Sequence, residues 1–535
     1  MLIGLDFDNT LARYDNAFAF EAKRQSLVPN EWLGIKQDLK NRLHAMENGD
    51  MLWQKIQGQV YGPSIHKAEL FPGVARFLLR CKLQNHTVFI VSHKTKYGHF
   101  DLTKTLLRQA ALDWMHNNGF FDENMFAINK ENVFFSTTRQ DKVSKINELS
   151  LDVFVDDLEE VFAVDGFPNI NKILFSNTAK NKYHDTMCSN WLSIEHNILG
   201  EITNNEIKHI ANSIYKGSII SIKNINGRGN SRIYKALSSE GDNFILKDYP
   251  DLLNDPRERL VTEVSALNMI ESINQTPKVV AFNERQNIAL YEWIEGVHPS
   301  NIDDKHIIEA LKFIKNIQNV KDKESCGLAS EACLSAEHLF TQIDDRFKKL
   351  SLVNNQYLQD FLNNTFIILW DEVREWSKQC WPKDNITSDL PYSMQVLSPS
   401  DFGLHNALLQ DNGRLCFLDF EYFGRDDPVK LMADFVWHPG MSLSDSQKIT
   451  WLKGTSKIFK KDPNLNERFY AAWPLYGLRW SLILLNEFLN DVWQKRVYAN
   501  ANLQNQKRNK LENQLKKAKA VCEQIQVVNM KCPYV

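Results

Sequence analysis

The sequence predicts an α/β domain followed by an α+β domain. Three observations lead to this fold class. A chain of 535 residues is too long for one ordinary hydrophobic core. Its first third alternates short apolar runs with amphipathic helical patterns. The later part begins with strand signals separated by turns and continues with mostly helical patterns. We expect four parts: a first domain, a linker, a second domain and a polar C-terminal helix, over residues 1–195, 196–212, 213–495 and 496–535.

The first domain carries four strand signals between helical patterns, namely LIGLDF, TVFIVS, VFVDD and KILFS. This alternation predicts a parallel, Rossmann-like sheet with helices on both faces. In such sheets a ligand binds beyond the carboxyl ends of the strands. Residues 15–70 lack strand signals and place Trp, Leu and Ile at helical spacing, which predicts a small helical cap inserted after the first strand.

The second domain begins with an antiparallel meander. Its strand signals are SIISIKNI, SRIYKALS and NFILKDY, with a turn at Gly241 and Asp242 between the last two. Residues 301–378 and 442–487 are mostly helical in pattern. The Lys-rich tail has a thin apolar stripe and too few heptads for a dimerising coil, so we expect a surface helix packed on this domain.

Composition favours a small polar ligand. With 63 basic against 66 acidic residues and a net charge of −3, nothing indicates binding to nucleic acid or to an anionic membrane. The eight cysteines form no C-x-x-C pair, which is typical of reduced thiols in a cytoplasmic protein. No export signal or membrane insertion is expected, and the oligomeric state is left open.

The first predicted site opens the chain. Asp6 and Asp8 stand two residues apart at a strand end, so their side chains point to the same side. A Mg²⁺ ion can neutralise such a carboxylate together with a phosphate. Asp6 would attack phosphorus to form an aspartyl phosphate, while Asp8 would protonate the leaving oxygen and later activate water. Thr10 would help to orient the phosphoryl oxygens.

At this point the sequence resembles the haloacid dehalogenase-like (HAD) phosphatases. Their D-x-D-x-T signature stands here as Asp6, Asp8 and Thr10. The companions of that signature follow in the family's order: Ser92 after TVFIVS, a lysine within TTRQDKVSKI, and the pair Asp156 and Asp157 after the strand DVF. The resemblance covers about residues 1–180 and implies a Mg²⁺-dependent phosphatase with a small cap.

The resemblance also implies roles for these residues. Ser92 would hold a phosphate oxygen, and the lysine would pair with the nucleophile and the phosphate. Lys142 is our choice for that lysine and Lys145 is the alternative. The metal site would be completed by Asp156 and Asp157 beside Asp6 and Asp8, and the pattern leaves open which of the two later carboxylates contacts the metal.

The second predicted site lies in the other domain. Asp401 and Asn406 stand five residues apart on an expected loop, and Asp419 follows the strand signal RLCFLDF. This spacing suits a kinase, in which one carboxylate accepts the proton of a hydroxyl group and an Asn with an Asp holds Mg²⁺ on the nucleotide phosphates. Asp401 is therefore the predicted base, and Asn406 and Asp419 are the predicted metal ligands.

The segments SDFGLHNALL and LDFEYFGRDDPVKLMADF resemble the aminoglycoside phosphotransferase and choline kinase families, which have a protein-kinase-like fold. The resemblance extends over about residues 215–490 and implies that ATP is bound. Lys247 would hold its α- and β-phosphates and pair with Glu263, with Glu258 as the weaker alternative. A turn containing the small residues Gly227, Gly229 and Ser231 would cover the phosphates. The strand IALYEWIEG would supply the hinge for adenine through Glu292, Trp293 and Ile294.

Two features bear on activity and acceptor. Where those families usually carry a His-Gly pair before the base, this chain has Pro399 and Ser400. No long activation segment separates Asp419 from Asp427, which favours a small-molecule acceptor over a protein. Aromatic and charged residues between 469 and 487 either line the acceptor pocket or belong to the core.

Together the two sites predict a bifunctional enzyme with a small phosphorylated substrate and a hydroxyl acceptor. A phosphatase and a kinase acting on one position would be futile, so we expect them to act on different positions, for example of a sugar phosphate in glycan-precursor synthesis. Two alternatives remain at this point. One domain is active and the other is a ligand-binding regulator, or the chain is an aminoglycoside-type kinase.

Overall fold

The structure is a computed structural model that describes residues 1–100, 103–178, 183–225, 231–250, 257–321, 323–499 and 501–534. Two compact units divide the described residues. The N-terminal unit comprises Met1–Ile207, and the C-terminal unit comprises Lys208–Pro250 and Arg257–Val535. Each unit is described by itself below.

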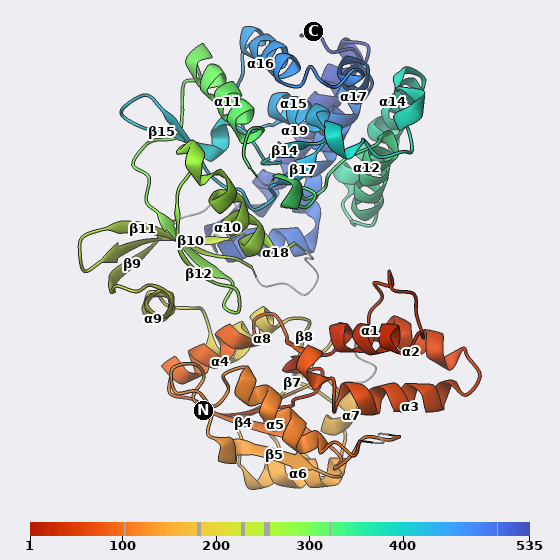
Figure 1. The fold of residues 1–535 in the computed structure, drawn as a ribbon, viewed down its shortest axis with the longest axis vertical. Coiled ribbons are helices and arrows are strands. Elements are labelled where there is room, and N and C mark those ends of the chain that lie inside the picture. Colours follow the sequence, from red (N-terminus) through yellow and green to blue (C-terminus); the bar gives the residue numbers. More distant parts are fainter. Residues whose placement is uncertain are drawn as a thin grey trace. The chain divides into compact units, whose positions relative to one another are not determined.

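A six-stranded parallel sheet forms the centre of the N-terminal unit (Figure 1). Its order is β5-β4-β1-β6-β7-β8, which confirms the expected parallel sheet. The strands are almost wholly apolar because both of their faces are covered. Their bounds are β1 Leu2–Leu5, β4 Thr87–His93, β5 Val133–Ser136, β6 Val153–Asp156, β7 Asn171–Phe175 and β8 Thr186–Cys188.

The strand order reverses at β1. From β1 the chain proceeds to β4 and β5 on one side, and then crosses to β6, β7 and β8 on the other. The carboxyl ends of β1, β4 and β6 therefore lie next to one another at a topological switch point, where open α/β sheets bind ligands. Backbone pairing continues past β1, because the Asp6 N–H donates to the Val155 carbonyl at 2.9 Å.

Three helices form a cap between the short strands β2 (Ala12–Arg13) and β3 (Glu69–Leu70), as the sequence predicted for residues 15–70. They are α1 Asp15–Arg24, α2 Lys36–His44 and α3 Gly49–Val60, and they pack on one another at one end of the unit (Figure 1). Phe18 of α1 stacks on Trp53 of α3 with ring centroids 5.1 Å apart.

Buried ion pairs join the helices around the sheet. Arg80 of α4 (Val74–Leu83) donates to Glu195 of α8 (Trp191–Leu199) at 3.0 Å and to Glu206 of α9 (Asn204–Ile214) at 2.9 Å. Helices α8 and α9 thus occupy much of the segment expected to be a linker. The remaining helices of the unit are α5 Leu107–Asn117, α6 Arg139–Glu148 and α7 Glu159–Phe162.

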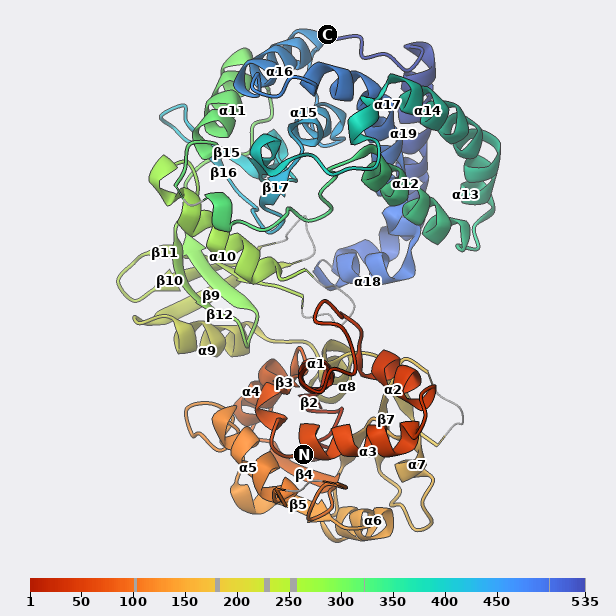
Figure 2. The ribbon, with the colours of Figure 1, turned by 45° about the vertical axis from the view of Figure 1, so that its right-hand side comes forward.

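The C-terminal unit begins with a five-stranded antiparallel sheet of order β12-β13-β11-β10-β9, in which the expected meander is β9, β10 and β11. Figure 2 shows helix α10 (Arg259–Ile270) beside this sheet. The strands are β9 Ile219–Ile225, β10 Arg232–Ser238, β11 Asn243–Asp248, β12 Val279–Asn283 and β13 Ile288–Glu292.

A helical part follows the sheet and contains most of the buried core. Helix α17 (Leu465–Leu484) runs through it and packs on α12, α14, α15 and α19 (Figure 2). The polar tail folds as α18 Asn490–Ala499 and α19 Lys507–Val527, and α19 buries Leu515, Ala518, Cys522 and Ile525. The other helices are α11 Asp304–Ile317, α12 Ala336–Ser351, α13 Gln356–Phe361, α14 Ile367–Cys380, α15 Pro428–Trp437 and α16 Asp445–Ile458.

Two short antiparallel sheets of two strands each lie within the helical part. They pair β14 (Val396–Ser398) with β17 (Gly424–Asp426) and β15 (Ala407–Leu409) with β16 (Leu415–Phe417). Each predicted kinase residue between 401 and 419 lies in or next to these strands.

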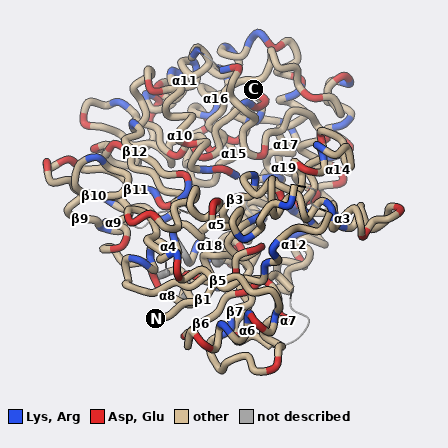
Figure 3. Tube along the Cα trace, turned by 60° about the horizontal axis from the view of Figure 1, so that its bottom comes forward, with Lys and Arg blue, Asp and Glu red and all other residues tan. Residues whose placement is uncertain are grey.

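Charges of both signs are interspersed along the trace of both units (Figure 3). This distribution agrees with the near-neutral composition. Across the described residues, every helix is either too short or too polar to cross a bilayer.

Candidate active sites

The carboxyl ends of β1 and β6 and the helix α6 bring three charged groups together in the N-terminal unit. Lys142 donates from Nζ to Asp6 Oδ1 and to Asp156 Oδ2, both at 2.6 Å. All three side chains are buried. Lys145, the alternative from the sequence, instead pairs with Glu148 at the surface at 2.5 Å. Of the two lysines, the fold therefore places Lys142 beside Asp6.

Burial governs the charges at this site. It raises the pKa of Asp6 to about 6, although the attraction of Lys142 opposes the rise. It also raises the pKa of Asp157 well above its usual range, with Asp156 and Asp6 adding to the effect. For Lys142 burial alone would lower the pKa, but Asp156 and Asp6 raise it above its ordinary value. The cluster thus carries more negative charge than one lysine neutralises.

A divalent cation fits this excess of carboxylates. Asp6, Asp156 and Asp157 each offer an oxygen, and the three oxygens lie within 4.8 Å of one another. Both oxygens of Asp156 already accept hydrogen bonds, from Lys142 and from the Leu158 N–H at 2.9 Å. No described residue donates a hydrogen bond to Asp157, so its carboxylate is available to a cation. Mg²⁺ prefers carboxylate oxygens of this kind.

Asp8 lies outside that group and has its own partners. The Tyr14 hydroxyl donates to Asp8 Oδ1 at 2.5 Å, and Lys94 Nζ lies 3.0 Å from Oδ1 and 2.8 Å from Oδ2. Lys94 is only 3% exposed, although the sequence around it reads equally well as a solvated basic loop. Its burial depends on contacts from distant segments, since its ammonium group also lies over the rings of Phe7 and Tyr61.

The cap also contributes to this site. Lys36 of α2 donates to Asn9 Oδ1 at 2.7 Å and to the Tyr61 hydroxyl at 3.1 Å. Asn9 follows Asp8 and adopts the left-handed backbone conformation, with φ of 59°. Ser92 and Thr10 are buried as well, and the Thr10 hydroxyl has no hydrogen-bond partner among the described residues.

In the C-terminal unit, one lysine joins three carboxylates. Lys247 of β11 donates to Glu263 of α10 at 2.7 Å and to Asp419 at 2.6 Å, and lies 3.2 Å from Glu421. The predicted partner Glu263 is thus in place. Glu421 is a site residue that the sequence reasoning missed. Its position two residues after Asp419 is a signal that could have indicated it.

Asp419 has the most strongly perturbed proton affinity of the three carboxylates. Burial raises the pKa of Asp419 to about 7, with Lys247 opposing and Glu421 and Glu263 adding to the rise. Their oxygens lie within 4.8 Å of one another, an arrangement that fits a cation on nucleotide phosphates. Asp419 has a φ of 66°, so the chain turns sharply just after β16 and directs this carboxylate toward Lys247.

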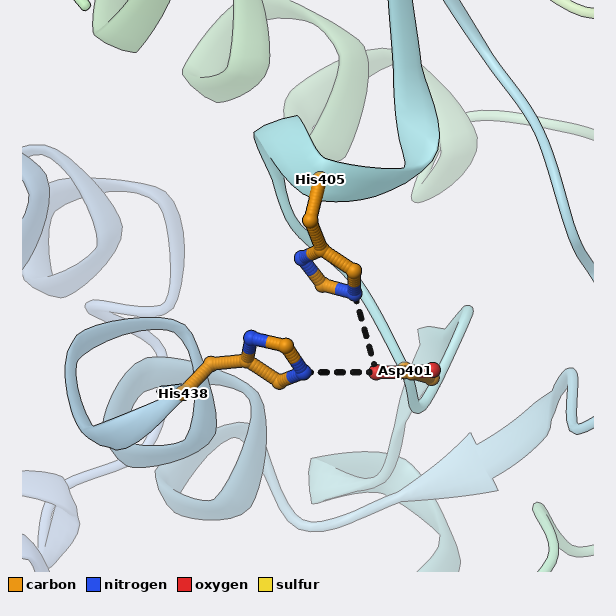
Figure 4. A group of neighbouring side chains, drawn as sticks. All are labelled: Asp401, His405 and His438. Carbon is orange, nitrogen blue, oxygen red and sulfur yellow. Dashed lines mark hydrogen bonds and ion pairs between the residues drawn. The ribbon is translucent and has the colours of Figure 1, made fainter. Parts of the chain in front are cut away.

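Figure 4 shows a second cluster of the C-terminal unit, centred on Asp401. His405 Nε2 lies 3.2 Å and His438 Nε2 lies 3.4 Å from Asp401 Oδ1. Asn406 donates to the Asp401 carbonyl at 3.1 Å, which joins the predicted base to the predicted metal ligand. Burial raises the pKa of Asp401, but the two histidines lower it more, so the net pKa is well below its usual range.

The loop before Asp401 is held by a buried lysine. Lys430 of α15 donates to Ser400 Oγ at 2.9 Å and to Asp426 at 2.8 Å. Ser400 has a φ of 68°, and its hydroxyl ties this turn to the helix. The Pro399-Ser400 turn is therefore anchored by Lys430 through the Ser400 hydroxyl.

The predicted nucleotide contacts are only partly described. Gly227 and Gly229 lie outside the described residues. Ser231 is buried, and its hydroxyl has no partner in the described part of the chain. Glu292 ends β13 and pairs with Phe244 of β11, and Trp293 and Ile294 follow it. The Lys235 ammonium lies 3.9 Å from the centre of the Trp293 ring.

The aromatic and charged residues on α17 belong mostly to the core. The side chains of Trp473, Tyr476, Arg479 and Trp480 are all less than 10% exposed. Arg479 is held by Asp434 and Glu331, and Trp480 donates to Asp434 at 2.7 Å. These side chains therefore belong to the core, which is one of the two alternatives that the sequence left open.

Comparison with known proteins identifies one segment of the chain. Residues 221–458 match the family model described as the phosphotransferase enzyme family, and they contain Lys247, Asp401 and Asp419. This segment is accordingly a phosphotransferase domain. The match leaves residues 1–220 and 459–535 uncovered, and no curated protein matches the chain.

Several solved structures resemble the chain at low identity. The choline kinase LicA from Streptococcus pneumoniae is 15% identical, with coverage of 56% of this chain and 94% of that one and a TM-score of 0.38. The spectinomycin phosphotransferase APH(9)-Ia is 12% identical, with coverage of 60% and 98% and a TM-score of 0.39. A choline kinase from Cryptosporidium parvum is 12% identical, with coverage of 60% and 97% and a TM-score of 0.40.

Proposed function

We propose that the chain is a two-site phosphotransfer enzyme, with an ATP-dependent kinase site for a small hydroxylated molecule and a separate phosphatase site. The observation that carries the proposal is the repeated arrangement of a buried lysine bound to two carboxylates. Lys247 with Glu263 and Asp419 forms one such set, and Lys142 with Asp6 and Asp156 forms the other. Neither arrangement is needed for packing, because buried charges cost free energy that apolar residues would not.

In the kinase site, Lys247 is the group that would bind the nucleotide phosphates. Asp401 would accept the proton of the acceptor hydroxyl as that oxygen forms its bond to the γ-phosphorus and the bond to ADP breaks. The family match over residues 221–458 supports this reading. Asn406 and Asp419 would hold Mg²⁺, which supplies charge neutralisation on the phosphates. Glu292, Trp293 and Ile294 are the proposed adenine contacts.

In the phosphatase site, Asp6 would attack the phosphorus of a phosphomonoester while Asp8 gives its proton to the leaving alcohol oxygen. Asp8 would then take a proton from water, whose oxygen displaces Asp6 and releases phosphate. Lys142 holds the nucleophile in place through its bond to Asp6. The resemblance of this region to HAD phosphatases supports the assignment, and Ser92 would hold a phosphoryl oxygen.

Mg²⁺ in this second site would be held by Asp6, Asp156 and Asp157, and it would supply charge neutralisation for the incoming phosphate. Asp157 is the ligand that the surroundings favour most, since both oxygens of Asp156 are already hydrogen-bonded. Asp8, held by Tyr14 and Lys94, keeps its acid–base role.

The two reactions would act on different positions, because removal of the phosphate just added would only consume ATP. A sugar monophosphate is a substrate class that satisfies this condition. The kinase would phosphorylate a second hydroxyl, and the phosphatase would then remove the original phosphate. Such a sequence would prepare a sugar for later transfer during glycan-precursor synthesis.

A phosphorus NMR time course tests the proposal. The purified chain is incubated with Mg²⁺ and ATP against pools of hexoses, heptoses, amino sugars, choline and their monophosphates. We expect a new phosphate ester, followed by free phosphate beyond that accounted for by ATP turnover. Phosphate release from added monophosphates without any new ester would contradict the kinase half. A stable new ester with no later phosphate release from any pool would contradict the phosphatase half.

A further inference from the structure

Two histidines that the sequence reasoning did not select converge on the proposed kinase base. His405 lies in the short 3₁₀ segment Leu404–Asn406, and His438 directly follows helix α15. Their Nε2 atoms lie 3.2 Å and 3.4 Å from the same atom, Asp401 Oδ1 (Figure 4). Two elements that are 33 positions apart in the sequence therefore supply donors to one oxygen.

The hydrogen bonds on the far side of the rings determine where the protons lie. The Gly440 N–H donates to His438 Nδ1 at 3.0 Å, so Nδ1 is an acceptor and the proton of the neutral ring is on Nε2. His405 Nδ1 is buried and has no hydrogen-bond partner among the described residues. The position that best accommodates its proton is Nε2, which faces the carboxylate. Both rings are thus set as Nε2–H donors to Asp401.

The packing keeps the two rings in this orientation. Their planes are 6° from parallel with centroids 3.7 Å apart, so two imidazolium charges there would repel each other. Glycine is required on both sides of the stack. A Cβ atom on Gly403 would lie 2.5 Å from His405 Nδ1, and one on Gly440 would lie 2.8 Å from His438 Cε1. Trp480 closes the edge, with its ring centroid 4.7 Å from that of His438.

The two oxygens of Asp401 differ as a result. Oδ1 faces both imidazole N–H groups, whereas among the described residues Oδ2 has only a long contact of 3.5 Å with Asn406 Nδ2. The Asp401 side chain is 35% exposed, compared with 14% for each histidine. One oxygen is therefore anchored inside the unit, and the carboxylate retains an accessible edge for a hydroxyl group.

We propose that His405 and His438 are positioning residues of the kinase site, which hold Asp401 by Oδ1 and present Oδ2 to the acceptor hydroxyl. The inference rests on the proposed kinase function, because only there does the orientation of Asp401 affect a reaction. Neither histidine would contact the acceptor or exchange its proton during transfer. Both would act through the direction of one carboxylate.

The tautomers can be measured without any activity. The full chain is labelled with ¹⁵N-histidine, and the two ring signals are assigned with His405→Gln and His438→Gln. We expect both rings to carry the proton on Nε2 at neutral pH, and both signals to shift in Asp401→Asn. A proton on Nδ1 of either ring, or signals that stay unchanged in Asp401→Asn, would overturn the inference whether or not the chain is a kinase.

A kinetic comparison separates positioning from a merely structural role. With Mg²⁺ and ATP, and water as the acceptor, we expect His438→Leu to lower kcat about tenfold while KM for ATP stays within about twofold. His438→Gln keeps an N–H donor near the Nε2 position and should recover most of the loss. Equal loss in both variants, or no loss in His438→Leu, would contradict positioning. If the wild-type chain shows no ATP-dependent transfer, the proposed kinase function fails, and the tautomer measurement alone decides the inference.

Discussion

Lys142 illustrates what a single residue does at the N-terminal site. Its ammonium group lies 2.6 Å from both Asp6 and Asp156, and all three are buried. A lysine so enclosed holds two carboxylates that would otherwise repel each other at short range. The same group would hold Asp6 in line with an incoming phosphorus, so its loss should affect both the local charge balance and the reaction.

Replacement of Lys142 should therefore abolish phosphomonoester hydrolysis. We expect Lys142→Met to lower kcat by about a hundredfold or more with p-nitrophenyl phosphate and Mg²⁺ as the assay, because it removes a preorganised positive charge. Lys145→Met is the matched control, since Lys145 pairs with Glu148 and lies over the Phe134 ring instead of contacting Asp6. Lys142→Arg, which keeps the charge, is compared in case the methionine variant misfolds. Equal activity in Lys142→Met, Lys142→Arg and the wild type would contradict the assignment.

Compared with Asp156, Asp157 should contribute less to the stability of the fold and more to the binding of Mg²⁺. Calorimetric titration should find Mg²⁺ binding to Asp157→Asn weakened at least about tenfold. The thermal midpoint should stay unchanged or rise, because the substitution removes a half-buried carboxylate that has no hydrogen-bond donor among the described residues. Asp156→Asn should instead lower the thermal midpoint, since Asp156 accepts bonds from Lys142 and Leu158. The opposite order of Mg²⁺ affinities in the two variants would show that Asp156 is the principal ligand.

The sequence indicated those site residues that follow strand ends, because the carboxyl ends of parallel strands meet at one edge of a sheet. Asp6 and Asp156 follow strand ends in this way, whereas Lys142 lies within α6 and was chosen over Lys145 through the family resemblance. Lys94 also follows a strand end, since β4 pairs with β1 and brings it to Asp8. His438 was not indicated, since it follows a helix 33 positions after His405. Spacing along the chain carries no information about such approaches.

At the scale of elements, one buried ion-pair cluster joins α4, α8 and α9. Burial tends to raise the pKa of Glu206, but its hydrogen bonds, above all from Arg80, lower it to about 2. A carboxylate whose folded pKa lies below its unfolded value stabilises the fold above the unfolded pKa and loses this effect as the pH falls toward the folded value. The contribution of Glu206 should therefore disappear between about pH 4.5 and pH 2.

Glu206→Gln tests that linkage. At pH 7 the variant should be less stable by about 2–3 kcal/mol, and the difference from the wild type should shrink as the pH falls below about 4.5. Acid unfolding followed by circular dichroism provides the measurement. Glu148→Gln changes an exposed carboxylate of the same unit and should cost less than about 1 kcal/mol. A pH-independent difference for Glu206→Gln would contradict the linkage.

The C-terminal tail should be part of the core of its unit. Ile525 of α19 is fully buried and packs against Gly477 of α17, whereas Val527 in the same helix is 85% exposed. Ile525→Ala should cost about 2–4 kcal/mol of unfolding free energy, and Val527→Ala should stay within about 0.5 kcal/mol of the wild type. Urea unfolding of the full chain, monitored by tryptophan fluorescence, measures both. Equal stability of the two variants would place α19 outside the core.

Element types followed from sequence patterns more readily than element packing did. In the parallel sheet, the meander and the helical cap, the spacing of apolar residues along the sequence directly predicts strand or helix. The tail gave only a polar helix with a thin stripe, and the residues that it buries include Ala518 and Cys522, which contribute little to such a pattern. Small residues at a close helix contact are recognised only when the partner helix is known.

At the scale of the whole molecule, we infer two separate chemical sites on one chain. Each site has its own lysine and carboxylates, drawn from a different compact unit. Substitution in one should therefore leave the other reaction unchanged, because mutations at distant sites without shared partners act independently.

The most direct test of the central claim is a phosphorus NMR time course on Asp6→Asn and Asp401→Asn beside the wild type. With ATP, Mg²⁺ and the pools of acceptors and monophosphates, Asp6→Asn should form the new ester and fail to release phosphate from monophosphates. Asp401→Asn should release phosphate from monophosphates and form no ester. The account is contradicted if either substitution leaves every activity unchanged, or if one substitution abolishes both reactions while the protein remains folded.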